Sequence, residues 1–458
     1  MKKGYLHHLI QILWDAIRRL DGTIHPMELE RMAVMVHRVM FHKSRMFHSM
    51  EHVFGFLDSD DPIVALAAVF HDLVYLQVDE GLPSPLEDLL KPYLQNDRMD
   101  VRFLPTARES KEFQLCCTLF GRDPTVSPDE PKGLNEFLSG FTLSLLLGGK
   151  VSSLDLGSVL LCIEATIPFR GIDPQGRGVG EALEARARTA FPEASEDRIQ
   201  QMVHRAIAFA NRDVQDFSNP DAGDFLSNTW KLLPETNYTL RNRGAFSIRE
   251  YRTALCGMLN FFRSLDPDRI FHSYKGKPSE EEMKNLKEIA RMNLALSIQY
   301  LRAKLLAVSI LEALSILTGG EAPMALFMGD LNPSETDSTC LIRFLPSLPF
   351  PTWLQEEHPV VRLLRDGRLE ESSFDLRNSP FALWLYKRLR PEEWGRLAVG
   401  MERFFKGELS PQAFLALFPG CSRGKVEGPL AEIIQASMEM VLTRREYFQK
   451  ILHQGLLA

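Results

Sequence analysis

Apolar residues recur along most of the chain at spacings of three and four, which is the period of an α-helix. The first segment shows this pattern clearly, with one apolar face made by Leu6, Ile10, Leu13, Ile17 and Leu20. Further helices are predicted over residues 27–40, 62–76, 134–147, 154–167, 195–212, 248–265 and 279–317, and again within 380–453. Strand-type alternation of apolar and polar residues is scarce. We therefore predict an all-α protein.

Several predicted helices begin with residues that favour a helix start. Pro26 and Pro62 stand in the first turn of their segments. Ser195 is placed to cap the helix that follows it, and Ser279 with Glu282 fits a capping box. These signals fix the starts of the helices better than the apolar pattern alone.

Two stretches interrupt the helical pattern and suggest how the chain is organised. Residues 77–135 hold many Pro and Asp residues and are predicted to form a peripheral insertion. Residues 319–355 are rich in Gly, Pro and Ser and read as connecting loop. We predict an N-terminal domain over residues 1–240, a helical extension over 241–320 and a helical C-terminal region over 321–458.

Composition narrows the class of protein. The chain has 458 residues, 45% of them hydrophobic and 25% charged, which is ordinary for a soluble protein of more than one domain. The net charge of −7 argues against general nucleic-acid binding. The apolar run over 305–317 contains Glu312, so we expect a buried helix and no membrane span. Six cysteines without zinc-type spacing fit reduced thiols in a cytoplasmic protein.

The candidate chemistry lies in the sequence FHSMEHVFGFL and, shortly after it, AAVFHDLVY. His48 and His52 are four residues apart, so on a helix they would project from one face. His71 and Asp72 follow together at the end of an otherwise apolar helix. Buried ionisable groups are costly unless they are compensated, and a divalent metal ion compensates both imidazole and carboxylate. A HxxxH pair by itself is more often an ordinary pair of histidines, and the combination with the His-Asp pair favours a metal site.

These motifs resemble the HD superfamily of metal-dependent phosphohydrolases, most of all the cyclic-nucleotide phosphodiesterases and a group of predicted bacterial HD phosphohydrolases. The resemblance covers about residues 30–215 and implies an HD-domain helical bundle over residues 1–240. It implies that His52, His71 and Asp72 bind the metal and that His48 protonates the leaving oxygen. The family's last ligand is a distant Asp, which Asp213 in IAFANRDVQDF matches; Asp216 is the alternative.

One segment departs from the family pattern. LLCIEATIPFRG is similar to a motif of the bacterial group, but Phe169 stands where that group has a histidine. This leaves a second metal ion open. His204 either replaces that ligand or is an ordinary histidine on a helix face, and Glu164 and Arg170 either face the pocket or end a helix.

The resemblance implies a metal-dependent phosphohydrolase or phosphodiesterase with Mn, Fe, Zn, Co or Mg as its ion. In that interpretation the ion activates water, Asp72 orients that water and His48 is the general acid. The expected substrate is a small phosphorylated molecule, with nucleotides among the candidates. The alternative is a catalytically weak HD domain that binds a nucleotide as a sensor or regulatory module, and a structural helical adaptor is a third interpretation.

Overall fold

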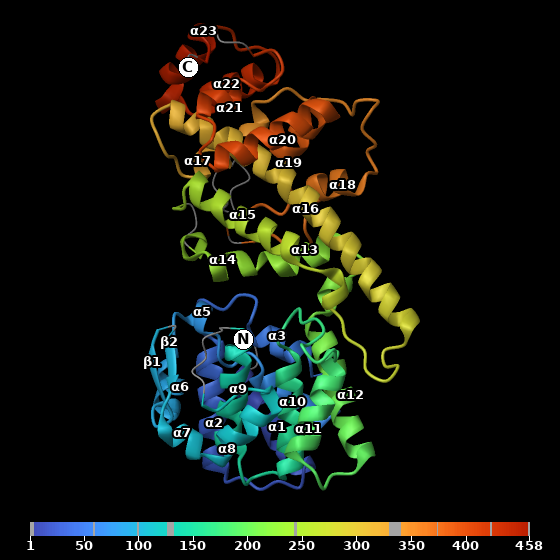
Figure 1. Cartoon of the computed structure of the whole chain (residues 1–458). Helices are drawn as coiled ribbons and strands as arrows, with labels where there is room; N and C mark the ends of the chain where they lie inside the picture. The colour runs from blue at the N-terminus through green and yellow to red at the C-terminus, as the bar shows by residue number, and fades with distance from the viewer. Residues whose placement is uncertain are drawn as a thin grey trace. The chain divides into compact units, whose positions relative to one another are not determined.

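The computed structural model describes residues 4–57, 60–98, 100–125, 132–241, 245–328, 340–372, 374–421 and 424–456. This part of the chain is mostly α-helical (Figure 1). The strands within it are β1 (Leu94–Asp97) and β2 (Asp100–Phe103), which pair as one antiparallel hairpin. The prediction of an all-α protein is thereby confirmed at the level of fold class.

The chain divides into two compact units. Unit 1 comprises residues 1–218 and 265–291, and unit 2 comprises residues 219–264 and 292–458. The chain thus leaves unit 1 after Ser218, returns to it for a short segment and then leaves it again. The sequence placed domain boundaries near residues 240 and 320, and those boundaries stay predictions.

Unit 1 is a bundle of helices. Its elements are α1 (Tyr5–Arg19), α2 (Pro26–Met40), α3 (Met50–Gly55), α4 (Pro62–Phe70), α5 (Leu76–Asp79), α6 (Ser84–Leu90), the hairpin β1–β2, α7 (Pro105–Glu109), α8 (Lys111–Phe120), α9 (Leu134–Leu147), α10 (Ser153–Ala165), α11 (Val179–Ala190), α12 (Glu196–Asp213), and the short 3-10 helices η1 (Gln215–Ser218) and η3 (Pro267–Arg269).

Helix α10 forms the centre of unit 1. Every residue from Leu156 to Ala165 is buried, and the helix contacts α4, α8, α9, α11 and α12. Close packing at one point depends on Gly157, since a Cβ there would lie 2.3 Å from the Phe191 ring. A helix buried on all sides needs an apolar residue at nearly every position, which explains why α10 shows no single apolar face.

Helix α8 belongs to this core as well. Phe113, Cys116 and Leu119 are almost fully buried, and α8 packs against α9, α10 and α11. Residues 111–120 therefore lie inside unit 1, although the sequence assigned them to a peripheral insertion. Several of the Pro and Asp residues that suggested an insertion, among them Pro85, Asp97, Asp100 and Pro105, belong to the short elements α6, β1, β2 and α7.

Unit 2 is also helical. Its elements are α13 (Ala222–Trp230), α14 (Leu232–Thr236), η2 (Tyr238–Arg241), α15 (Ile248–Ser264), the C-terminal part of α16 (Glu280–Leu317), α17 (Ala325–Met328), η4 (Leu341–Arg343), α18 (Pro359–Arg365), α19 (Pro380–Arg388), α20 (Pro391–Phe405), α21 (Pro411–Leu415), α22 (Gly428–Met440), η5 (Leu442–Arg444) and α23 (Arg445–Gln454).

Helix α16 is the long helix predicted from the sequence. It starts at the predicted capping box, where the Ser279 hydroxyl accepts a hydrogen bond from the Glu282 N–H and the Glu282 carboxylate accepts one from the Ser279 N–H. Within the described ranges, α16 is the one helix long and apolar enough to cross a membrane, and 72% of its most apolar stretch is buried inside the protein. That degree of burial is typical of the core helix of a folded domain.

Candidate metal centre

The candidate site is assembled from three segments of unit 1 that are distant in sequence. His52 lies on α3, and Asp213 is the last residue of α12. His71 is the residue at which α4 ends, and Asp72 follows it. The apolar residues of α4 bury that helix against α1 and α10, so its C-terminus is held in the interior of the unit. The polar pair His71–Asp72 is thereby held in the interior, between the apolar residues of α4 and the buried Leu73 and Val74.

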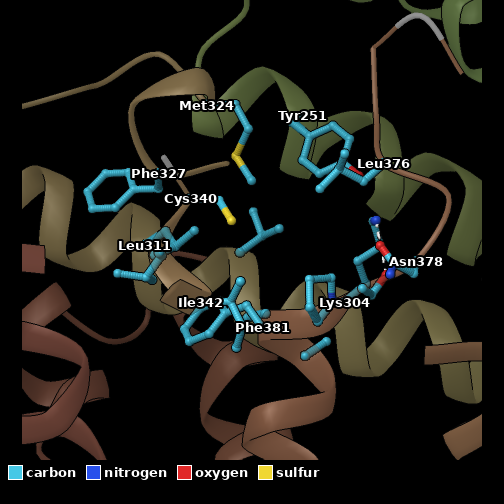
Figure 2. Close-up of a pocket in the computed structure, with 16 residues that line it drawn as sticks. Tyr251, Lys304, Leu311, Met324, Phe327, Cys340, Ile342, Leu376, Asn378 and Phe381 are labelled. Atoms are coloured by element: carbon cyan, nitrogen blue, oxygen red, sulfur yellow. Dashed lines mark hydrogen bonds between the residues drawn. The ribbon is translucent and has the colours of Figure 1, made fainter. Parts of the chain in front are cut away.

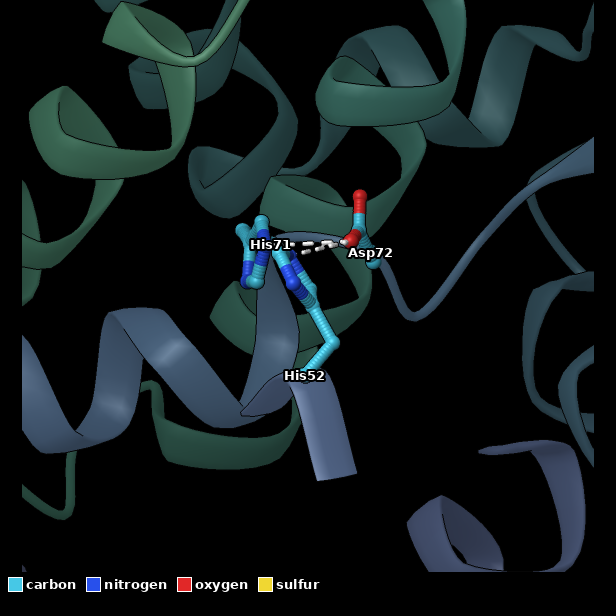
Figure 3. Close-up of side chains that lie close together, drawn as sticks. All are labelled: His52, His71 and Asp72. Atoms are coloured by element: carbon cyan, nitrogen blue, oxygen red, sulfur yellow. Dashed lines mark ion pairs between the residues drawn. The ribbon is translucent and has the colours of Figure 1, made fainter. Parts of the chain in front are cut away.

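The side chains of these four residues converge. Figure 3 shows three of them, His52, His71 and Asp72. Asp72 Oδ2 lies 3.0 Å from His71 Nε2 and 3.6 Å from His52 Nε2. Asp213 Oδ1 lies 3.3 Å from His52 Nε2 and 3.6 Å from His71 Nε2. Ligand atoms of His52, His71 and Asp72 all lie within 4.8 Å of one another. One small cation could contact donor atoms from all three segments.

The donor atoms fit a divalent metal ion. The Nε2 atoms of both histidines are buried, and neither makes a hydrogen bond of good geometry. His71 Nδ1 lies 2.9 Å from the Ala68 carbonyl oxygen, to which it donates in the tautomer that leaves Nε2 free as a ligand. Two imidazole nitrogens and two carboxylates are a donor set suited to Zn, Mn, Fe or Co.

The electrostatics of the metal-free cluster are those of an ion-pair network. Burial alone would lower the pKa of His71, but the charges of Asp72 and Asp213 raise it well above 6.5. Burial alone would raise the pKa of Asp72, but His71, His48 and His52 lower it. The pKa of Asp213 is likewise lowered, by His52 and His71 against the effect of burial. The two carboxylates are therefore charged at neutral pH and available to a cation.

Aromatic rings pack against the histidines of the cluster. The Phe56 ring lies with its centre 5.2 Å from that of each of His52 and His71, and the Phe209 ring lies 5.6 Å from His71. Such rings lower the local dielectric constant, which strengthens the interaction of the carboxylates with any cation between them.

His48 lies close to the cluster but not where the sequence placed it. Helix α3 begins only at Met50, so His48 is in the bend before the helix and does not lie one helical turn from His52. The prediction of a helical HxxxH pair was wrong, because Ser49 has the extended backbone of a residue that precedes a helix. The His48 ring still lies 6.4 Å from the His52 ring and edge-on to Tyr75 at 4.4 Å, and it acts electrostatically on Asp72.

The two candidates for the last ligand are placed differently. Asp213 closes α12 and reaches both histidines, as described above. Asp216 lies three residues on, within η1. The geometry thus brings together all four residues that the sequence put forward as metal ligands, with Asp213 as the closing acid.

The residues considered for a second metal ion have other surroundings. The half-buried His204 ring lies 5.1 Å from the Tyr274 ring, and its Nε2 atom lies 3.3 Å from the Gln200 side-chain nitrogen. Phe169 has a left-handed backbone (φ 55°) and contacts Phe217. Neither observation supports a second ion.

Glu164 and Arg170 form a buried ion pair at the end of α10. Arg170 donates to the Glu164 carboxylate at 2.6 Å and to the Glu164 backbone carbonyl, and Arg186 donates to the same carboxylate at 2.7 Å. The fully buried Glu164 is thereby compensated. The contacts favour the helix-ending role over the pocket-facing one.

Two further residues near the cluster were missed in the sequence. The buried Arg45 donates to the backbone carbonyls of Asp72 (2.6 Å) and Leu73 (3.0 Å) and pairs with Asp79, so it fixes the turn that carries Asp72. Glu136, in the first turn of α9, has its pKa raised to about 7 by burial and by the charges of Asp72 and Asp213. Nothing in the sequence marks Arg45, whereas an acid at the start of a buried helix could have been noticed.

Comparison with protein-family models, with curated proteins and with solved structures gave no significant match to this chain. The argument about function therefore depends on the residues and geometry described above.

Proposed function

We propose that unit 1 is a metal-dependent phosphohydrolase of the HD kind, which cleaves a small phosphoester such as that of a nucleotide. The observation that carries the proposal is the convergence of His52, His71, Asp72 and Asp213 from three distant segments, with both buried Nε2 atoms 3.0–3.6 Å from carboxylate oxygens.

In this proposal each residue of the cluster has a separate role. His52, His71, Asp72 and Asp213 hold the ion, which when bound supplies an acidified water and a counter-charge for the phosphate oxygens. The Ala68 carbonyl holds the His71 ring with Nε2 toward the other ligands, and Arg45 holds the Asp72 turn. His48 stands beside the cluster and donates a proton to the departing alkoxide, a task suited to a group that titrates near neutral pH.

The experiment is a paired measurement of metal content and hydrolysis on the full chain. The purified protein is analysed for Mn, Fe, Co, Zn and Mg, loaded with each ion and assayed against a panel of phosphomonoesters, phosphodiesters and nucleotides. His48→Ala should keep its metal and lose roughly 10²–10⁴ in turnover. Asp72→Ala should lose both, and His7→Ala, at an exposed position on α1, should change neither.

Two outcomes would overturn the proposal in different ways. If no ion binds, the cluster is a structural ion-pair network. If an ion binds and every phosphoester stays intact while a nucleotide binds tightly, unit 1 acts as the nucleotide sensor described above. Loss of metal in His48→Ala would mean that His48 is itself a ligand.

A further inference from the structure

Two hollows in the molecule differ in what they offer a ligand. The pocket in unit 2 shown in Figure 2 has a volume of about 50 Å³, and its charged lining residue, Lys304, already donates hydrogen bonds to Asp375 and Ser379. A groove in unit 1 has a volume of about 880 Å³, which is in the range of sites that hold small organic ligands. The groove is therefore the better candidate for a ligand site.

The groove lies between α12, the N-terminal end of α4 and the segment 276–282, where α16 begins. All of its lining residues belong to unit 1, and the residues of the metal cluster are not among them. Two of its walls are joined by Asn211, whose side chain donates to the His272 carbonyl at 2.8 Å and accepts from the His272 N–H at 2.9 Å. The groove is thus built within one unit and is separate from the candidate metal centre.

Two cations on the groove wall have donor groups that no described residue uses. Arg205 donates from Nε to Asp61 Oδ2 at 2.6 Å, and neither of its Nη atoms makes a hydrogen bond to the described part of the chain. The Arg205 side chain is 22% exposed. The exposed side chain of Lys277 also lines the groove and makes no hydrogen bond or ion pair to the described residues. Both residues can therefore donate to a ligand.

The acids of the groove are already engaged within the protein. The Asp61 carboxylate caps α4 by accepting a hydrogen bond from the Ile63 N–H at 2.9 Å, and its other oxygen pairs with Arg205. The Glu282 carboxylate accepts hydrogen bonds from the Ser279 N–H and hydroxyl, both at 2.8 Å. Neither acid is paired with Lys277.

The balance of charge favours an anion. The groove lining holds three cations, since Arg212 adds to the two described above, against two acids. His204 also lines the groove but adds no charge near neutral pH, because burial and the neighbouring Lys277 and Lys275 lower its pKa. A phosphate group accepts several hydrogen bonds and pairs with both a guanidinium and an ammonium group. Phosphate therefore matches the unused donors of the groove.

We propose that this groove binds the phosphate monoester of a small organic molecule, with its phosphate beside Arg205 and Lys277 and its organic part against Val64, Ala208 and Pro278. An inorganic phosphate would occupy a small part of the 880 Å³ and leave these apolar side chains uncovered. Nucleotides and sugar phosphates share the required chemistry. The inference concerns a site apart from the metal centre and does not depend on the function proposed for unit 1.

The test is calorimetric titration of the full chain after treatment with a chelator, so that no ion at the metal centre can bind the phosphate. The probes are AMP and glucose 6-phosphate, and adenosine, glucose and inorganic phosphate are the comparisons. At least one ester should bind about tenfold or more tightly than its unphosphorylated parent and than inorganic phosphate. Binding of AMP alone would support a nucleotide as the ligand, and binding of glucose 6-phosphate alone would support a sugar phosphate.

Two variants locate the bound ester in the groove. Lys277→Glu reverses one charge and should weaken binding of the ester by about tenfold without affecting its parent. Ala208→Trp places an indole ring in the groove from an exposed position on α12 and should abolish binding of the ester. Lys284→Met removes an exposed lysine of α16 that does not line the groove, so it should bind the ester as the wild type does.

The proposal is overturned if neither ester binds, if the parents or inorganic phosphate bind as tightly as the esters, or if Lys277→Glu binds the ester like the wild type. The last result would place the ester elsewhere, the metal centre included. If Ala208→Trp does not fold, Lys277→Glu still decides the question, because the exposed Lys277 side chain has no partner in the described part of the chain to lose.

Discussion

Replacement of Asp213 by Asn examines the assignment of the last metal ligand, with Asp216→Asn as the matched control. Both changes remove one carboxylate charge near the end of α12 and keep the size of the side chain. Asp213 lies 3.3 Å and 3.6 Å from the Nε2 atoms proposed to share the ion. Metal affinity should therefore fall in Asp213→Asn and stay within about twofold of wild type in Asp216→Asn.

The expected size of the loss follows from the distances. Coulomb's law gives roughly 5 kcal/mol for two unit charges 3.5 Å apart at an effective dielectric constant of 20. The side chain of Asp213 is 20% exposed, which weakens this interaction, and asparagine keeps one oxygen that can bind metal. We therefore expect Asp213→Asn to lose about 1.4–2.8 kcal/mol of metal-binding free energy. That is a ten- to hundredfold loss of affinity.

Isothermal titration of the chelator-treated protein with Mn²⁺ and Zn²⁺ measures this difference directly. Thermal unfolding with and without the ion provides a second readout, since an ion that binds only the folded state raises its stability. Unchanged affinity in Asp213→Asn together with a large loss in Asp216→Asn would refute the assignment and leave the other three ligands standing.

Three further predictions follow from the geometry of unit 1. In the metal-free protein, the stabilisation from the His71–Asp72–Asp213 network should be complete between about pH 4 and 6.5, because the carboxylate pKa values are lowered and that of His71 is raised on folding. This stabilisation should be lost below about pH 4, as the carboxylates are protonated, and above about pH 6.5, as His71 loses its proton. Denaturant unfolding measures the free energy of unfolding across this range, and a value that does not change with pH would contradict the prediction. Arg45→Lys should cost about 1–3 kcal/mol of stability and weaken metal binding, because lysine cannot reach both the Asp72 turn and Asp79, while the exposed Arg38→Lys should do neither. Gly157→Ala should destabilise unit 1 by about 1–2 kcal/mol, because the added Cβ would clash with Phe191. The control Gly257→Ala has nothing within 4 Å of the added Cβ and should be neutral or stabilising by up to about 1 kcal/mol. Equal melting temperatures of the two variants would contradict this reasoning.

Much of the fold was predictable because the helices follow an apolar period with clear start signals. Helix α9 has the predicted bounds, and α12 and α16 begin at their predicted caps Ser195 and Ser279. The apolar period did not predict helices that are short or that are buried on several sides. Residues 77–125 contain short elements and the fully buried face of α8, so local composition suggested a periphery that packing contradicts.

The candidate site was predictable to the extent that its residues interrupt apolar sequence. His71, Asp72 and Asp213 stand at helix ends, where a charged group after a buried segment is conspicuous. Arg45 could not be found in this way, because its role consists of contacts with backbone carbonyls 27 and 28 residues away. The position of His48 was misjudged for a local reason, since a four-residue spacing indicates a shared helix face only where the helix includes both residues.

The charges of the candidate metal centre explain how the cluster is compensated without an ion and how the proposed ion would compensate it. In the metal-free state the proton on His71 offsets part of the charge of Asp72 and Asp213, so the two carboxylates are not left unpaired in an apolar site. A divalent ion held as proposed would bind through the same Nε2 atom and displace that proton, while its own charge would compensate both carboxylates. Metal binding should therefore release about one proton per site and should strengthen as pH rises toward the raised pKa of His71. Titration in two buffers of different ionisation enthalpy measures the release. A value near zero would mean that His71 is already neutral before the ion binds, and the ion-pair description of the metal-free state would then be wrong.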